Sequence, residues 1–206
     1  MALSKIQPAS IDLTANYAFT GTNSISTIDY AEKKLTTVTA SGDSNISITS
    51  GIDSTYNIYK FRFINIHPSN DQQIFEFNGT TDGTNFNVTK TTSVFAAKHL
   101  EDGSSQQLAY MASYDNAQST NFQDIQREVG NGNDECFVAE MFLFDPSSTT
   151  FVKHFISRAN TYKATNETEE FYVAGYFNTT SAITGLKFQF EGGTIDSGTI
   201  EMYGIN

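Results

Sequence analysis

Apolar and polar residues alternate along much of the chain, most clearly near its C-terminus. Residues 186–191 read Leu-Lys-Phe-Gln-Phe-Glu. Because successive side chains of a β-strand point to opposite faces, this run predicts a strand with its three apolar side chains in a core. Residues 199–205 predict a last strand that buries Ile200 and Met202. The glycine-bearing loop between these two segments predicts that they form a hairpin.

Similar segments recur upstream. The other predicted strands are residues 35–39, 46–49, 56–66, 74–77, 86–88, 94–100, 108–113, 137–144, 151–156 and 171–177. The segment 56–66 is apolar on both faces, which is typical of a central strand that is covered on each side or of a strand that crosses between sheets. Glycine-bearing turns predict one hairpin between 74–77 and 86–88 and another between 94–100 and 108–113.

One segment, residues 121–130, breaks this alternation. Phe122, Ile125 and Val129 are three and four positions apart, which is helical spacing. A Ser-Thr pair precedes the segment and a glycine closes it, as expected for an N-cap and a C-terminal stop. The pattern predicts one short amphipathic helix within a long connection.

Many short strands without alternating helices predict an all-β fold. We expect an antiparallel two-sheet β-sandwich, jelly-roll-like, with one short helix. A chain of 206 residues suits a single domain of this class and buries a sizeable core without disulfides. Residues 1–30 carry few strand-like patterns, so we expect an N-terminal arm or docking segment there and a single sandwich domain over 31–206.

The charge balance narrows the choice of partners. The chain carries 12 Lys plus Arg against 23 Asp plus Glu, a formal net charge of −11. A negative surface repels phosphate backbones and anionic headgroups, so we expect no nucleic-acid and no membrane partner. The N-terminus lacks the apolar run of a signal peptide, and no window has the length of a spanning helix. These features predict a soluble protein that is made in a cytoplasm.

Patterns for nucleophilic catalysis or metal binding are weak. The one cysteine, Cys136, stands in an apolar run and is expected to be buried and inert. His67, His99 and His154 lack the spacing of zinc ligands. The G-x-S-x-G pattern of a strained nucleophile turn is missing from the sequence.

Carboxylates offer two further candidates. Glycosidases use paired carboxylates. The acidic residues considered for such a pair are Glu76, Glu140, Glu169 and Glu170. Nothing in the sequence sets two of them at a catalytic separation, so we predict no enzyme.

A loop with Asn131, Asn133, Asp134 and Glu135 offers oxygen ligands for calcium. Its spacing differs from an EF-hand, and a polar surface loop is the favoured interpretation. We therefore predict no cofactor and no metal.

Aromatic side chains on a sandwich surface can stack on sugar rings. The candidates are Tyr56, Tyr59, Tyr110, Tyr114, Tyr172 and Tyr176. The absence of Trp counts against sugar binding, and these tyrosines can equally rim the core. The sequence leaves both interpretations open.

Three segments together resemble a known class of protein. They are MALSKIQPASIDLTANYAFTGT at residues 1–22, FLFDPSSTTFVKHFIS at 142–157 and NTTSAITGLKFQFEGGTIDSGTIEMYGI at 178–205. They resemble small virion structural proteins of marine tailed phages such as cyanophages. The last segment also resembles the closing hairpin of jelly-roll domains in phage fibres and decoration proteins.

This resemblance implies a non-enzymatic virion component: a capsid decoration, a fibre or a tail-associated protein. The implied partners are other virion proteins, of capsid or tail, and further copies of the chain in a homo-oligomer. A receptor- or glycan-binding module of a tail fibre, with a host surface glycan as its ligand, is the alternative. The implied location is the virion, after synthesis in the host cytoplasm.

Overall fold

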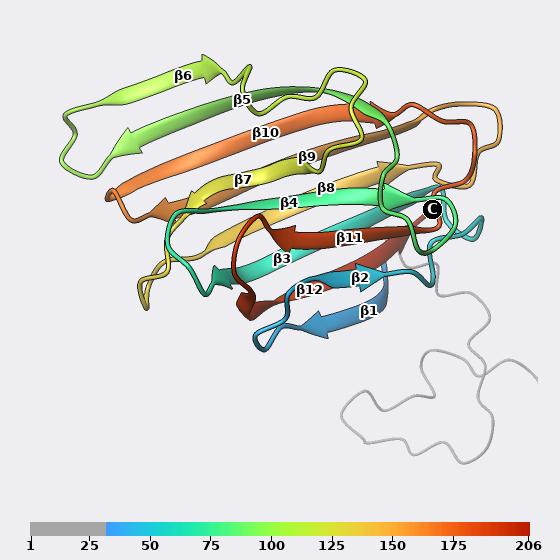
Figure 1. Cartoon of the computed structure of the whole chain (residues 1–206), viewed down its shortest axis with the longest axis horizontal. Coiled ribbons are helices and arrows are strands. Elements are labelled where there is room, and N and C mark those ends of the chain that lie inside the picture. Colours follow the sequence, from blue (N-terminus) through green and yellow to red (C-terminus); the bar gives the residue numbers. More distant parts are fainter. Residues whose placement is uncertain (1–31) are drawn as a thin grey trace, which may run out of the picture. The chain divides into compact units, whose positions relative to one another are not determined.

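The computed structural model describes residues 32–206, which are all-β, with 58% strand and no helix (Figure 1). The strands are β1 (Lys33–Thr39), β2 (Ile46–Ile48), β3 (Ile58–Pro68), β4 (Gln73–Thr80), β5 (Lys90–Leu100), β6 (Gln106–Tyr110), β7 (Gln123–Val129), β8 (Phe137–Phe144), β9 (Lys153–Lys163), β10 (Glu167–Phe177), β11 (Gly185–Phe190) and β12 (Ile195–Ile205). Every pair of neighbouring strands is antiparallel.

The strands form one sheet that is nearly closed into a barrel. Hydrogen-bonded neighbours follow the order β1-β12-β3-β8-β9-β7-β4-β11-β2, and β10, β5 and β6 continue outward from β9. The pairing between β9 and β7 consists of one residue pair, Val129 with Lys163. This narrow junction, called the seam below, joins β7-β4-β11-β2 to the rest of the sheet.

The core is built mainly from phenylalanines on the inner faces of strands. Phe63 of β3 packs against Phe188 of β11, with ring centroids 5.1 Å apart. Phe137 of β8 packs against Phe75 of β4 at 4.9 Å. All four are buried, and each contributes about 1.5–3 kcal/mol through apolar burial. These contacts between strands far apart in the sequence hold the two sides of the barrel together.

Local alternation predicts the inside and outside of the strands well. Leu186, Phe188 and Phe190 are buried, as are Ile200 and Met202 of the last strand. The central position of β3 is confirmed, because it lies between β12 and β8. The prediction that both of its faces are covered is wrong, because Arg62 on its outward face is exposed.

Of the predicted hairpins, only one is confirmed. It is β5 with β6, which pair directly. The C-terminal hairpin is wrong, because β11 pairs with β4 and β2 whereas β12 pairs with β3 and β1. Residues 86–88 form no strand, so the hairpin predicted there is wrong too.

The helix predicted over 121–130 is wrong, because residues 123–129 form strand β7. The register between β4 and β7 shifts twice, between Gln73 and Phe75 and again between Phe75 and Glu76. A bulge places consecutive residues on one face, and Ile125 and Gln126 are indeed both buried. These bulges erase period-two alternation and leave a spacing that imitates a helix.

The all-β class is therefore confirmed in its antiparallel form. The division into two separate sheets is not confirmed, since a single sheet runs through all twelve strands. The N-terminal arm predicted over residues 1–30 lies outside the described residues.

Candidate functional site

A row of side chains crosses the outward surface of the larger part of the sheet. The register places Tyr110, Phe95, Tyr172, Arg158, Glu140, Arg62, Glu201 and Thr37 side by side on β6, β5, β10, β9, β8, β3, β12 and β1. We call this surface the outer face. Aromatic rings occupy one end of the row, and charges of alternating sign occupy the other.

The aromatic end of the row is ordered by stacking. The rings of Phe95 and Tyr172 are stacked at 4.5 Å with an interplanar angle of 9°. The guanidinium of Arg158 lies over the Tyr172 ring, 5.6 Å from its centroid, and forms an ion pair with Glu170 at 2.6 Å. The pKa of the Glu170 carboxyl is lowered by its hydrogen bonds to Arg158 and Tyr172. These contacts hold the rings in fixed positions on the surface.

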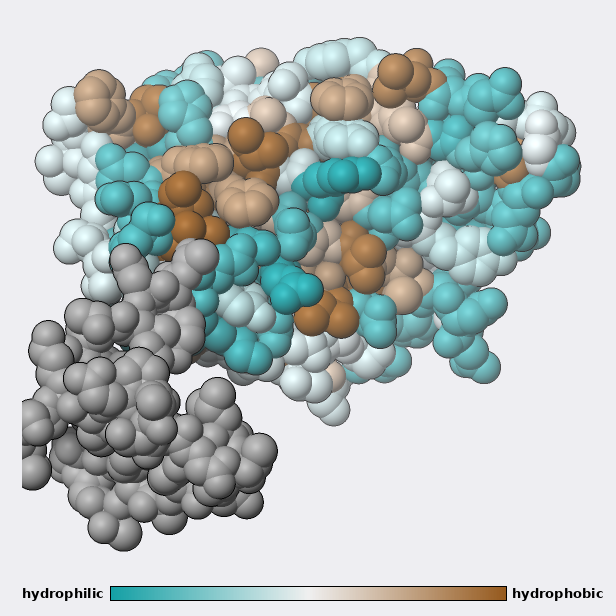
Figure 2. All heavy atoms as spheres, turned by 180° about the vertical axis from the view of Figure 1, so that it is seen from behind, coloured by the Kyte–Doolittle hydropathy of each residue, from teal (hydrophilic) through white to brown (hydrophobic). Residues whose placement is uncertain are grey.

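Large apolar side chains are concentrated on the outer face. Six such side chains are exposed in the part of the chain that the structure describes: Phe95, Leu108, Tyr110, Val138, Phe151 and Ile156. All except Phe151 lie on outward positions of β5, β6, β8 and β9. Figure 2, which views the molecule from behind, shows apolar residues in brown gathered between polar residues in teal. Two shallow hollows of about 440 and 500 Å³ lie beside Arg158 and Ile156.

The predicted sugar-stacking tyrosines do not form one site. Tyr110, Tyr172 and Tyr176 share the outer face. Tyr59 is fully buried and donates to the backbone oxygen of Asp53 at 3.0 Å. Tyr56 packs edge-on against it. The sixth, Tyr114, lies elsewhere, beside Arg127. Phe95 was not among the six candidates, which were all tyrosines. The alternation in β5, where Val94 and Ala96 are buried, indicates that Phe95 faces outward.

A second candidate is a polar cavity of about 600 Å³, which we call the acidic pocket. Glu76 of β4 and Asp124 of β7 are direct cross-strand partners there, and Glu191 also lines it. Burial and the charges of Glu76 and Glu191 raise the pKa of Asp124 to about 7. Burial likewise raises the pKa of Glu76, which accepts a hydrogen bond from Gln189 at 2.7 Å.

The charge of Lys90 acts on Glu76, but the ammonium group of Lys90 is hydrogen-bonded elsewhere. Its ammonium donates to the backbone oxygens of Val88 at 3.3 Å and of Asn121. Burial lowers the pKa of Lys90 to about 8. The acidic pocket thus holds two carboxyl groups, Glu76 and Asp124, whose pKa values are both raised. Of these two residues, only Glu76 was among the candidates from the sequence.

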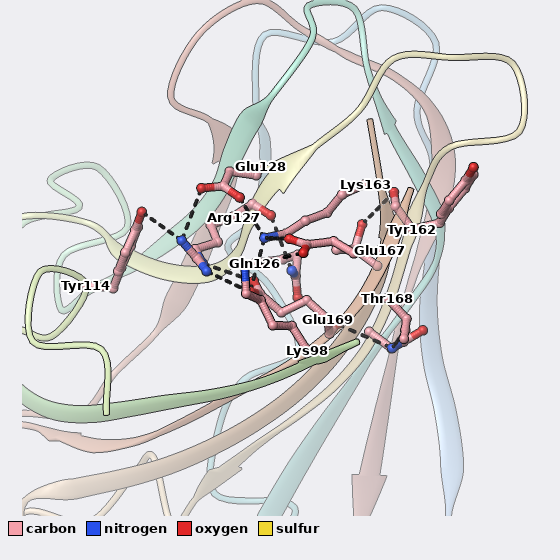
Figure 3. A network of polar contacts seen from close by, with 12 residues as sticks. Lys98, Tyr114, Gln126, Arg127, Glu128, Tyr162, Lys163, Glu167, Thr168 and Glu169 are labelled. Atoms are coloured by element: carbon pink, nitrogen blue, oxygen red, sulfur yellow. Dashed lines mark hydrogen bonds and ion pairs between the residues drawn. The ribbon is translucent and has the colours of Figure 1, made fainter. Parts of the chain in front are cut away.

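A third cluster, the seam network, ties four strands together by ion pairs (Figure 3). The ammonium of Lys163 lies 2.6, 3.1 and 3.0 Å from Glu128, Glu167 and Glu169. Arg127 donates to both oxygens of Glu169, at 3.0 and 2.7 Å. Lys98 pairs with Glu167 at 3.3 Å. Three cations thus balance three carboxylates around buried Lys163 and Glu169.

The seam network has a structural task at a specific place. Its members come from β5, β7, β9 and β10, where β7 and β9 share one residue pair. The ion pairs therefore supply contacts that the backbone ladder lacks at this junction. Glu169, a candidate catalytic acid from the sequence, is fully buried in this network and has no access to a substrate.

The remaining sequence candidates lie apart from one another. Glu140 pairs with Lys60 at 3.2 Å on the outer face. Glu135 turns back to accept a hydrogen bond from the Gly132 N–H at 2.5 Å. Within residues 32–206, no group of three or more His, Cys, Asp or Glu is placed to hold a metal ion. The same residues contain no helix with the length and apolarity to span a membrane.

The cysteine and histidines are likewise dispersed. Cys136 is half-buried rather than fully buried, and burial raises the pKa of its thiol, which disfavours the reactive thiolate. His67 contacts the Gly132 oxygen at 3.1 Å. His154 lies beside Tyr176 on the outer face, with ring centroids 5.9 Å apart, and His99 is exposed on β5.

Comparison with protein-family models, curated proteins and solved structures gives no match to this chain. The resemblance to phage virion proteins therefore stays an expectation from the sequence.

Proposed function

We propose that this protein is a non-enzymatic structural component of a tailed phage virion that binds neighbouring virion proteins through the outer face. The observation that carries the proposal is the concentration of exposed apolar side chains there. Ile156 is 50% exposed, Val138 43% and Phe95 44%. Monomeric proteins seldom leave large apolar patches uncovered, and such patches commonly mark interaction sites.

Electrostatics on the outer face suit a protein partner. Arg158, Glu140, Arg62 and Glu201 alternate in sign along one row, so the face carries no large field of either sign. A neighbour with its own alternating charges can match this row, which gives specificity more than raw affinity. The chain has a net charge of −11, so the rest of its surface repels other acidic proteins.

The strand order supports a finer description of the fold as a jelly-roll-like sandwich. The chain pairs β1-β12-β3-β8 on one side and β2-β11-β4-β7 on the other, so β1 and β2, and likewise β3 and β4, lie on opposite sides. Two four-stranded layers related in this way are the plan of a jelly roll, which recurs in viral capsid and lectin domains. The remaining strands, β9, β10, β5 and β6, widen the first layer.

The test measures binding of the full chain to purified virions of the phage that encodes it. Ile156→Lys places a charge in the middle of the outer face, and we expect it to weaken co-sedimentation with particles by about tenfold or more. Ser47→Lys is the matched control, because Ser47 is also an exposed strand residue but lies on β2. The proposal fails if proteomics finds no copies in particles, or if both variants bind as well as the parent.

The alternative function is glycan binding, favoured by the stacked Phe95 and Tyr172 rings. Flat, fixed aromatic surfaces with adjacent charged groups suit sugar rings. Glycan arrays with the parent protein and with Tyr172→Ala separate the two functions. Binding that is lost with Tyr172→Ala supports the alternative, and binding that survives removes its basis.

A further inference from the structure

Three strands end the sheet within the described part of the chain, because β1, β2 and β6 each pair with one neighbour. An edge strand presents unpaired backbone groups that can pair with another chain, and proteins protect such edges with lysines or by keeping them short. The edge at β1 begins with Lys33 and Lys34, and β2 has three residues. The edge at β6 has neither protection.

Three residues of β6 have their backbone N–H and C=O groups on the side away from β5, where no strand pairs with them within the described residues. Met111 N–H donates to the Val94 oxygen at 2.8 Å, and Leu100 N–H donates to the Ser105 oxygen at 3.0 Å. Hydrogen-bonded and non-hydrogen-bonded pairs alternate along an antiparallel ladder. Met111 and Ser105 both take part in hydrogen-bonded pairs with β5, so every second residue between them does the same. The N–H and C=O groups of Gln107 and Ala109 therefore face β5. Those of Gln106, Leu108 and Tyr110 face away from β5.

The side chains and charge of this edge suit one occupant in particular. Leu108 is 73% exposed and Tyr110 59% exposed, and residues 103–114 contain no acidic or basic residue. In a chain of net charge −11, such a neutral stretch is a place where two identical molecules approach with little repulsion.

We propose that β6 is a homodimerisation edge, at which a second copy of this chain adds its own β6 in antiparallel pairing. The two-fold axis passes through Leu108, so that Leu108 faces Leu108 of the second copy and Gln106 faces Tyr110. Such an interface is self-complementary. It joins the two outer faces into one continuous surface, with the Tyr110, Phe95 and Tyr172 rings repeated on either side of the axis.

The inference stands on the β6 edge alone and goes beyond the proposed function, because purified protein can dimerise whether or not it binds particles. A ladder of five residues buries less than the roughly 1,200–2,000 Å² of a standard stable interface. The dimer is therefore expected to dissociate on dilution and to be favoured at the high local concentration of a repeating assembly.

Sedimentation velocity of the full chain, from about 1 µM to about 1 mM, tests the proposal. We expect the parent to shift from monomer to dimer as concentration rises. Leu108→Pro removes an outward N–H that the β5 ladder does not use, so it is expected to stay monomeric with an unchanged thermal midpoint. Leu108→Ala keeps that N–H, and is expected to dimerise more weakly than the parent.

Should Leu108→Pro fail to fold, Leu108→Lys carries the test, since two ammonium groups across the axis are expected to weaken association by about tenfold or more. Hydrogen exchange supplies the second measurement. The amides of Leu108 and Tyr110 are expected to gain protection only at dimer concentrations. The proposal is overturned by a parent that stays monomeric throughout, by a folded Leu108→Pro or Leu108→Lys that dimerises like the parent, or by protected edge amides in the monomer.

Discussion

Strand β7 contributes to two clusters of carboxylates that solve the same electrostatic problem in opposite ways. In the acidic pocket, burial and neighbouring negative charges raise the pKa of Asp124 to about 7. In the seam network, burial also opposes ionisation of Glu128 and Glu167, yet their pKa values are lowered, because Lys163 hydrogen-bonds to both. The position of the cations, rather than burial alone, decides the direction of each shift.

The two clusters on β7 therefore have different roles. The seam network is neutral as a group and closes a junction where backbone pairing is sparse, so its charges are structural. The acidic pocket leaves its carboxylates facing a cavity, with Lys90 bound to backbone oxygens instead. Substitutions in the two clusters should therefore change the free energy of unfolding by different amounts and with a different dependence on pH.

The largest expected effect is that of Lys163→Met, which leaves buried carboxylates without their shared cation. Breaking one partner of a buried pair costs about 3–5 kcal/mol of unfolding free energy. Urea unfolding at neutral pH measures it. Lys34→Met is the control, because the Lys34–Glu201 pair is partly exposed and solvent-exposed ion pairs contribute little to stability. Equal losses for the two variants would contradict the structural role of the seam network.

The next effect is a change in the pH dependence of stability with Asp124→Asn. The folded-state pKa of Asp124 lies above its ordinary value of 3.8, at about 7. Between these values the folded state keeps a proton that the unfolded state has lost, so this residue makes stability fall as pH rises from about 4 to about 7, with no further loss above. Asp124→Asn is expected to flatten this fall, as measured by urea unfolding at several pH values.

Asp53→Asn is the matched control for this experiment. Asp53 is exposed, and hydrogen bonds with Thr55 lower its pKa, so its contribution is lost only at pH values below the window of Asp124. We expect Asp53→Asn to leave the slope between pH 5 and 7 unchanged. A slope that persists in Asp124→Asn and disappears in the control would show that the acidic pocket is not its source.

A smaller effect is expected from Glu76→Gln. It removes the negative charge directly across the ladder from Asp124 but keeps a similar side-chain shape. The pKa of Asp124 should fall toward its ordinary value without reaching it, because burial remains the largest cause of the shift. NMR titration of the Asp124 carboxyl carbon measures the change. An unchanged pKa would show that Glu76 exerts no influence across the pocket.

The smallest effect is expected from Glu191→Gln. Glu191 is exposed, so solvent screens its charge more strongly than that of Glu76. The same titration should show a fall in the pKa of Asp124 that is smaller than the one caused by Glu76→Gln. A larger fall would show that Glu191 affects the pKa of Asp124 more strongly than Glu76 does, which would contradict the geometry of the pocket.

The sequence by itself determined which side of many strands faces inward. Alternation is a local property of extended backbone, so Phe188 and Ile200 could be assigned to the core without knowledge of their partners. The same reasoning marked β8 within its observed bounds, Phe137–Phe144. It failed at β7, where bulges disrupt the period and make Phe122, Ile125 and Val129 imitate a helix.

Apart from the β5–β6 hairpin, which its glycine-bearing turn predicted, only the tertiary structure decided which strands pair, and it alone decided which charges meet. Strands β11 and β12 are adjacent in sequence but pair with different neighbours, since pairing is fixed by core contacts between distant segments. Lys163 and Glu128 are 35 residues apart, and no local pattern marks them as partners. The outer face arose in the same way: Tyr110 and Tyr172 share it with Phe95 because β5 lies between β6 and β10, a relation set by long-range hydrogen bonding rather than by local sequence.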